Sequence, residues 1–161
     1  MIGVRVELPS NAPIVLLREV TGQSRLLPIF IGAPEATAIA LALDGVTTPR
    51  PMTHDLLRDV LEELSTDVER IVVTELRDKT FFAELHLVRE GERIVISSRP
   101  SDAIALAVRT GTPIFAAEDV IDEAGYRETE AESESEDQSE EVVEQFKEFI
   151  DSISPEDFDT E

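Results

Sequence analysis

The sequence predicts a domain of mixed strands and helices, built from a duplicated unit in which a β-hairpin is followed by a helix. The main observation is a motif that occurs twice: residues 34–43 read PEATAIALAL and residues 100–108 read PSDAIALAV. Each copy follows two apolar, β-like runs separated by a turn at a glycine, Gly22 in the first copy and Gly91 in the second. An apolar stripe at helical spacing between the two copies predicts an additional helix.

Each copy of the motif carries one carboxylate at the expected start of its helix, Glu35 in the first and Asp102 in the second. If the two units pair in space, these carboxylates could lie on a common surface and bind a metal ion or transfer protons. The alternative needs no function, because the positive end of a helix dipole favours an acidic side chain in the first turn. Both interpretations stay open on the sequence alone.

The first half of the chain reads as three strands and two helices. Alternating apolar residues and Gly/Pro turns predict the strands. Proline starts the first helix, because its missing N–H has no helical partner there, and Gly45 ends that helix. Thr53 is expected to cap the second helix, whose apolar stripe is Leu56, Leu57, Val60, Leu61 and Leu64. The expected elements are strands over 2–7, 14–20 and 25–31 and helices over 34–43 and 54–64.

The second half repeats this plan. Two short turns, at residues 77–79 and at Gly91, separate three β-like runs, and the second copy of the motif follows them. The expected elements are strands over 68–76, 80–89 and 92–97, a helix over 100–109 and a short strand over 113–116.

The last quarter of the chain differs in composition. Residues 122–139 are mostly Glu, Ser, Asp and Thr, and they cannot bury enough apolar surface to offset the entropy of ordering. We therefore expect a domain over 1–121, a disordered acidic linker over 122–139 and an amphipathic helix and tail over 140–161. The apolar face of that helix is expected to dock on the domain, a second subunit or a protein partner, because an isolated helix of this length is marginal in water.

The formal net charge of −21 is concentrated in the same region. Residues 118–161 hold 19 Asp/Glu and 2 Lys/Arg, whereas residues 1–117 hold 16 Asp/Glu and 12 Lys/Arg. Neither part has the basic surface of a tight nucleic-acid binder. The chain has no cysteine, no apolar run of about 18 residues and no signal-peptide pattern at its start, so we expect a cytoplasmic protein without disulfides or membrane spans.

Several residue types that carry chemistry stand beside the expected helix starts. His54 and Asp55 open the second helix, where they could ligate a metal or transfer protons, or could serve only the capping and dipole of that helix. Arg99 could clamp a phosphate or hold Asp102 in a structural ion pair. Ser101 reads as a cap rather than a nucleophile, since no nucleophile-elbow motif surrounds it. The second histidine, His86, reads as a sheet-face residue.

Three segments, LLPIFIGAPEATAIALAL, RPMTHDLLRDVL and SSRPSDAIALAVRTGTPIFAAEDV, resemble in this order and spacing the bifunctional nuclease (DNase/RNase) family. The resemblance covers roughly residues 1–122. It implies an α+β fold with a strongly bent, barrel-like, mixed or antiparallel sheet and packed helices. It also implies a nuclease activity on RNA or DNA and self-association, for which a dimer is the commonest form.

The family pattern also implies which residues form the site. Nuclease chemistry needs an activated water and charge stabilisation at the phosphate, which carboxylates with Mg²⁺ or Mn²⁺ supply. In the expected arrangement Glu35, Asp55 and Asp102 are metal ligands, His54 is a base or ligand, and Arg50, Arg99 and Ser101 contact substrate. The full pattern falls on Glu35, Arg50, Pro51, Thr53, His54, Asp55, Arg99, Pro100, Ser101 and Asp102.

A second function stays open beside the nuclease. The paired units could instead form a small-ligand pocket or a subunit interface at the same motif residues, as in a regulatory or assembly module without enzymatic activity. The acidic tail has two corresponding interpretations. It could only solubilise the protein, or it could compete with nucleic acid for an arginine-lined site, because clustered carboxylates imitate a phosphate backbone.

Overall fold

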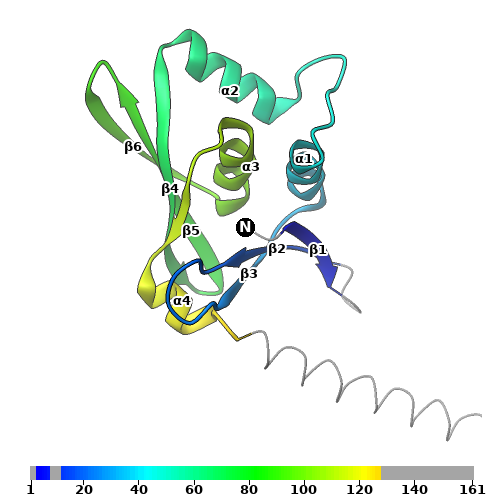
Figure 1. Cartoon of the computed structure of the whole chain (residues 1–161), viewed down its shortest axis with the longest axis vertical. Coiled ribbons are helices and arrows are strands. Elements are labelled where there is room, and N and C mark those ends of the chain that lie inside the picture. The colour runs from blue at the N-terminus through cyan, green and yellow to red at the C-terminus, as the bar shows by residue number, and fades with distance from the viewer. Residues whose placement is uncertain (1–2, 8–11, 128–161) are drawn as a thin grey trace, which may run out of the picture. The chain divides into compact units, whose positions relative to one another are not determined.

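The computed structural model describes residues 3–7 and 12–127 of the chain. Within them, seven strands and four helices form an α+β fold (Figure 1). In chain order the elements are β1 (Gly3–Glu7), β2 (Ala12–Arg18), β3 (Leu26–Phe30), α1 (Ala33–Leu43), α2 (Thr53–Glu63), β4 (Thr66–Arg77), β5 (Thr80–Arg89), β6 (Glu92–Ser98), α3 (Pro100–Thr110), β7 (Ile114–Ala116) and α4 (Glu118–Ala124).

The strands make two sheets. The first has the order β1-β2-β3 and is antiparallel throughout. The second has the order β6-β5-β4-β7 and is mixed, because β7 pairs parallel with β4 while the other pairs are antiparallel. Two tight hairpins shape this second sheet, at Asp78–Lys79 and at Glu90–Gly91, and all four turn residues have positive φ. Turns of this kind match the right-handed twist of the strands that they join.

Helix α3 is the centre of the domain (Figure 1). Its residues Ile104 and Leu106 are fully buried, and it contacts α1, α2, β4 and β5. The apolar run that makes its motif so prominent is therefore explained by burial on most sides. The main core cluster joins both sheets through this helix and consists of Val15, Leu17, Leu27, Ile29, Ile39, Val73, Ile104, Ala105 and Val120.

The α+β class and the expected strands and helices are present in the described residues, with bounds shifted by at most two residues. The single barrel-like sheet is wrong. β1, β2 and β3 pair only with one another, and β3 leads into α1 instead of joining β4, so the sheets stay separate. Each motif copy does follow an antiparallel hairpin, β2–β3 or β5–β6, but the two hairpins belong to sheets of different size, and the duplication stays a prediction.

Two local expectations also change. Thr53 is the first residue of α2 rather than its cap; Met52 precedes the helix in an extended conformation. Helix α4 was not expected at all, and it includes residues 122–124 of the predicted linker. The remaining residues of the predicted linker and C-terminal helix lie outside the described part, apart from 125–127. None of the helices in the described residues is long and apolar enough to cross a membrane.

Candidate functional site

Three helices begin beside one another, and their first turns carry the candidate residues. Glu35 is in the first turn of α1, His54 in that of α2 and Asp102 in that of α3. Arg99 is the residue that precedes α3, with an extended backbone. Since the packing of α1 and α2 on the buried α3 positions these helix ends, the core fixes the site.

Arg99 joins the two motif carboxylates. Its Nη2 lies 2.9 Å from Glu35 Oε1 and 2.9 Å from Asp102 Oδ1, and its Nε lies 2.7 Å from Asp102 Oδ2. Because one nitrogen bonds to both carboxylates, Glu35 and Asp102 lie within two hydrogen-bond lengths of each other. This meets the expectation that the two motif copies place their acids together.

His54 completes the group. Its Nε2 lies 3.2 Å from Asp102 Oδ1, and only 12% of its side chain is exposed. Burial raises the pKa of Asp102, but the hydrogen bonds from Arg99 and His54 outweigh burial and hold that pKa below its usual value. Two carboxylates in turn raise the pKa of Arg99. We call Glu35, His54, Arg99 and Asp102 the Arg99 cluster.

Arg99 is the accessible member of this cluster. Its side chain is 66% exposed, whereas that of Glu35 is 16% exposed. The bonds to Glu35 and Asp102 use Nε and Nη2 and do not occupy Nη1. The positive ends of three helix dipoles also meet here, which favours an anion beside the guanidinium.

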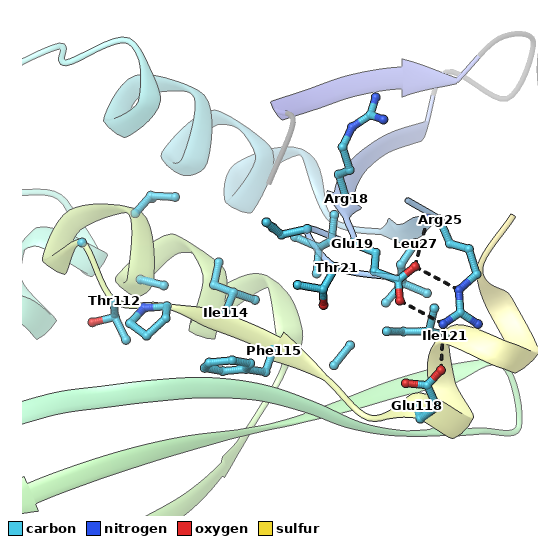
Figure 2. Close-up of a pocket in the computed structure, with 17 residues that line it drawn as sticks. Arg18, Glu19, Thr21, Arg25, Leu27, Thr112, Ile114, Phe115, Glu118 and Ile121 are labelled. Atoms are coloured by element: carbon cyan, nitrogen blue, oxygen red, sulfur yellow. Dashed lines mark hydrogen bonds and ion pairs between the residues drawn. The ribbon is translucent and has the colours of Figure 1, made fainter. Parts of the chain in front are cut away.

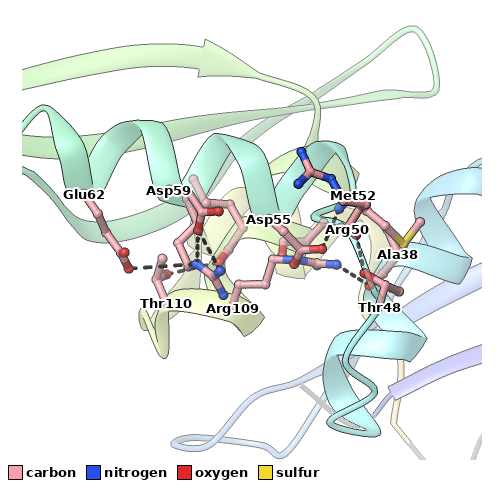
Figure 3. Close-up of polar contacts among 12 residues, drawn as sticks. Ala38, Thr48, Arg50, Met52, Asp55, Asp59, Glu62, Arg109 and Thr110 are labelled. Atoms are coloured by element: carbon pink, nitrogen blue, oxygen red, sulfur yellow. Dashed lines mark hydrogen bonds and ion pairs between the residues drawn. The ribbon is translucent and has the colours of Figure 1, made fainter.

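Asp55 does not join the Arg99 cluster and instead pairs with Arg109 (Figure 3). Its Oδ1 lies 2.6 Å from Nε of Arg109, and its Oδ2 accepts the backbone N–H of Met52 at 2.9 Å. The hydrogen bond from Arg109 is the main reason that the pKa of Asp55 is lowered. The side chain of Arg109 is 4% exposed and also donates to the carbonyl oxygens of Ala38 and Ala105. This pair therefore ties α1, α2 and α3 together behind the Arg99 cluster.

The two remaining candidates are not in these contacts. Arg50 is exposed in the loop between α1 and α2, where its carbonyl oxygen accepts a hydrogen bond from the Thr48 hydroxyl at 2.6 Å (Figure 3). Ser101 is 7% exposed, in the first turn of α3. His86, expected on a sheet face, lies on β5 with Nε2 3.1 Å from Glu84 Oε2.

The three carboxylates expected to bind a metal do not fit that task in this arrangement. Both oxygens of Asp55 are engaged by Arg109 and Met52, and the carboxylates of Glu35 and Asp102 are paired with Arg99. Among residues 3–7 and 12–127, no group of three or more His, Asp or Glu side chains is placed to hold a metal ion. Metal binding at the Arg99 cluster would require the guanidinium to move.

The sequence interpretation missed two residues of this region. Gly32 is expected from the sequence only to end a strand and begin a helix, but a Cβ at this position would overlap the Glu35 carboxylate, so the small residue makes room for that side chain. Arg109 was taken only as the end of a helix. A cation that follows a buried apolar run on one helix is a signal of a buried ion pair, because such a charge is costly to bury unless it is paired.

Comparison with known proteins agrees with the sequence resemblance. The model of the bifunctional nuclease domain family matches residues 15–129. An uncharacterized protein of Mycobacterium tuberculosis is 45% identical over 161 residues, which cover 98% of this chain and 95% of that protein.

Plant proteins that are named as nucleases are more distant. Bifunctional nuclease 2 of Arabidopsis thaliana is 31% identical over 112 residues, which are 66% of this chain and 34% of the plant protein. Bifunctional nuclease 1 of Oryza sativa subsp. indica is 27% identical over 117 residues, which are 71% of this chain and 35% of the plant protein. The similarity therefore spans about a third of the length of these plant proteins.

Proposed function

The chain belongs to the bifunctional nuclease domain family, and from this membership and the geometry of the Arg99 cluster we propose that it hydrolyses phosphodiester bonds of RNA or DNA. The observation that carries the proposal is the contact between His54 Nε2 and Asp102 Oδ1 directly beside the exposed Arg99. A hydrogen-bonded Asp–His pair next to an arginine combines proton transfer with phosphate binding.

Each member of the cluster has a role in this proposal. Arg99 binds the phosphate through Nη1, and the three helix N-termini favour the negative charge that grows in the transition state. Asp102 holds the imidazole of His54 in place. His54 takes a proton from the attacking water, whose oxygen bonds to phosphorus as the ester bond breaks, and then returns the proton to the leaving oxygen. Glu35 positions Arg99.

No step of the proposed reaction uses a metal ion, and Asp55 has a structural role. The proposal also predicts weak, salt-sensitive binding of single-stranded or short substrates, because residues 1–117 hold more acids than bases and only a few aromatic residues to stack on nucleobases.

Cleavage of a labelled single-stranded RNA by the full chain tests this function, with the His54→Gln and Asp102→Asn variants. His86→Gln is a matched control, since it removes the other histidine and a similar contact with a carboxylate, to Glu84. We expect His54→Gln to lower the rate by a factor of about 100 or more, the usual contribution of general acid–base catalysis, and His86→Gln to leave it unchanged. Folded His54→Gln protein that keeps the wild-type rate contradicts the proposal.

The same assay tests whether the reaction needs a metal ion. Rates measured with Mg²⁺, with Mn²⁺ and with a chelator should agree if the Arg99 cluster acts as proposed. A strict need for either ion would show that the cluster rearranges around a metal, with Arg99 displaced.

One observation favours assembly as a second function. Helix α2 has no buried residue, and its apolar stripe is left uncovered, with Leu56 55%, Val60 44% and Leu64 50% exposed. An exposed apolar stripe that begins beside His54 suits an interface between two copies of the chain. A homodimer through α2 would bring two Arg99 clusters near one interface.

A further inference from the structure

A cavity of about 720 Å³ lies near the C-terminal end of α3, whereas the Arg99 cluster lies at its N-terminal end (Figure 2). Its walls come from the end of β2, from β3, from the end of α3, from β7 and from α4. Apolar side chains make most of the surface, including Leu17, Leu27, Ala107, Ile114 and Phe115. None of the four residues of the Arg99 cluster lines it, so it is separate from the proposed active site.

The cavity runs along the free edge of β7. Strand β7 is the last strand of its sheet and pairs only with β4. Pro113 O accepts the N–H of Ile71, and Ala117 N–H donates to Val73 O, so the odd-numbered peptide groups bond to β4. Since successive peptide groups alternate in direction along a strand, the N–H and C=O groups of Ile114 and Ala116 point away from β4. Both residues line the cavity, and no residue of β4 does.

The end of the cavity beside α4 carries excess negative charge. The guanidinium of Arg25 contacts three carboxylates: Glu19 at 3.0 Å, Glu118 at 2.8 Å and Asp122. Glu118 and Asp122 are mostly exposed, at 71% and 61%. The other lining cation, Arg18, points away from this group (Figure 2). Three carboxylates around one guanidinium leave a net negative charge, which a second cation can neutralise.

We propose that this cavity binds an extended, mainly apolar peptide segment of another protein, which adds as a strand to the free edge of β7 and places a lysine or arginine beside Glu118 and Asp122. The outward peptide groups of Ile114 and Ala116 supply the backbone hydrogen bonds, and Phe115, which is 52% exposed, with the apolar walls supplies side-chain contacts. β7 is three residues long, so the paired part of the peptide spans about 10 Å. The acidic charge at the rim disfavours acidic segments.

Fluorescence anisotropy with the full chain tests the proposal. The probes are labelled hexapeptides of alternating valine and threonine that carry one lysine at either end. Matched probes replace the lysine by glutamate, or carry N-methyl groups on alternate amides, which prevents strand pairing without removing side chains. A further probe copies residues 140–153 of this chain. We expect saturable binding of a lysine peptide, and at least tenfold weaker binding of the glutamate, N-methylated and tail-derived peptides.

Variants of the protein locate the site. Ala116→Pro removes one outward N–H and leaves the bonds of the odd-numbered residues to β4 in place, as an edge strand allows. Glu118→Lys with Asp122→Lys reverses the charge beside Arg25. Asp119→Lys with Glu123→Lys makes the same change in net charge at two exposed positions of α4 that are not among the carboxylates around Arg25 and do not line the cavity. We expect the first two proteins to bind the lysine peptide at least tenfold more weakly, and the control pair to bind it like the wild type.

Three results overturn the proposal: no saturable binding of any lysine peptide, equal binding of the N-methylated and unmethylated peptides, or stronger binding of the tail-derived peptide. The comparison of peptide probes uses the wild-type protein alone, so the proposal stays testable even if Ala116→Pro lowers the melting temperature. Because the readout is peptide binding, the result is independent of nuclease activity.

Discussion

Arg109 Nε and Asp55 Oδ1 lie 2.6 Å apart, although 54 residues separate them in the sequence. The first prediction concerns the stability that this pair contributes. Asp55→Asn would leave the guanidinium of Arg109 buried without its carboxylate, and removing one partner of a buried ion pair is strongly destabilising. We expect the free energy of unfolding to fall by about 3 kcal/mol, measured by urea denaturation.

Asp59→Asn is the matched control, because Asp59 pairs with Arg58 on the same helix at 2.7 Å but at a more exposed site. A surface pair of this kind contributes about 0–1 kcal/mol. If the two variants lose equal stability, the pair of Asp55 and Arg109 contributes no more than a surface ion pair does.

The positions of Glu35, His54, Arg99 and Asp102 show how far the sequence could predict the site. The repeated motif offered a shared surface for two carboxylates as one of two interpretations. The structure does bring Glu35 and Asp102 together, because both helix starts depend on the same buried helix α3. The sequence could not predict that Arg99 would lie between them, since a local pairing with Asp102 and a contact over 64 residues look alike in a linear pattern. It also assigned Asp55 to the same site, although its neighbour in space is Arg109.

The fold was predicted where local patterns determine it. Turns at Gly22 and Gly91, and proline at the helix starts, correctly placed the hairpins and α1 and α3. The sheet arrangement depends on which strand edges meet, and local periodicity does not encode that. The exposed stripe of α2 shows the same limit, because amphipathic spacing identifies an apolar face but does not say whether the same chain covers it.

The second prediction is a pH dependence of stability that comes from the β2–β3 turn. Hydrogen bonds from Arg25 lower the pKa of Glu19 to about 2, from an ordinary value of 4.5. A carboxyl group with a lowered pKa stabilises the fold fully above its ordinary value, and this contribution is lost as the pH falls toward 2. The Glu19→Gln variant should therefore be less stable than the wild type near pH 6, and the difference should shrink steadily down to about pH 2.

Urea midpoints measured across that range for both proteins check this. Glu84→Gln serves as the control, since Glu84 is 40% exposed on β5 and takes no part in the turn. A difference between wild type and Glu19→Gln that stays constant with pH would mean that the side chain acts by shape alone.

The third prediction concerns Gly32. Its backbone has φ −75° and ψ 153°, which alanine adopts freely, so the cost of Gly32→Ala comes from displacing the Glu35 carboxylate rather than from backbone strain. Without that carboxylate, Arg99 carries less compensated positive charge. We expect Gly32→Ala and Glu35→Gln each to tighten binding of a single-stranded oligonucleotide several-fold at low salt.

Because both substitutions act through the same contact with Arg99, the double variant should bind no tighter than either single variant. Fluorescence anisotropy at about 50 mM salt measures this. Additive effects would show that Gly32 influences binding by a route other than Glu35.

The fourth prediction concerns assembly through α2. Lysines at Leu56 and Val60 would place charge in the middle of the exposed apolar stripe, and a dimer formed through this face should dissociate. Light scattering at micromolar concentration should give twice the mass of the 17.8 kDa chain for the wild type and the mass of one chain for Leu56→Lys with Val60→Lys. Glu62→Gln with Glu63→Gln changes the net charge equally on exposed positions of the same helix and should leave the dimer intact. A wild-type protein with the mass of one chain removes the assembly function.

The fifth prediction tests whether the acidic tail competes with nucleic acid. The deletion has to begin after α4, because removing the chain from residue 122, where the acidic linker was expected to begin, would remove part of α4 and the contact of Asp122 with Arg25. A deletion of residues 130–161 keeps all the residues that match the family and removes 14 Asp/Glu and one Lys.

If the tail competes for Arg99, the shortened protein should bind and cut single-stranded RNA better at low salt, and the gain should shrink as salt screens the charges. A variant with the 14 acids changed to Gln and Asn keeps the length of the tail and should behave like the deletion, because the competition depends on charge. Equal binding by all three proteins across the salt series would leave the tail as a solubilising or partner-binding segment.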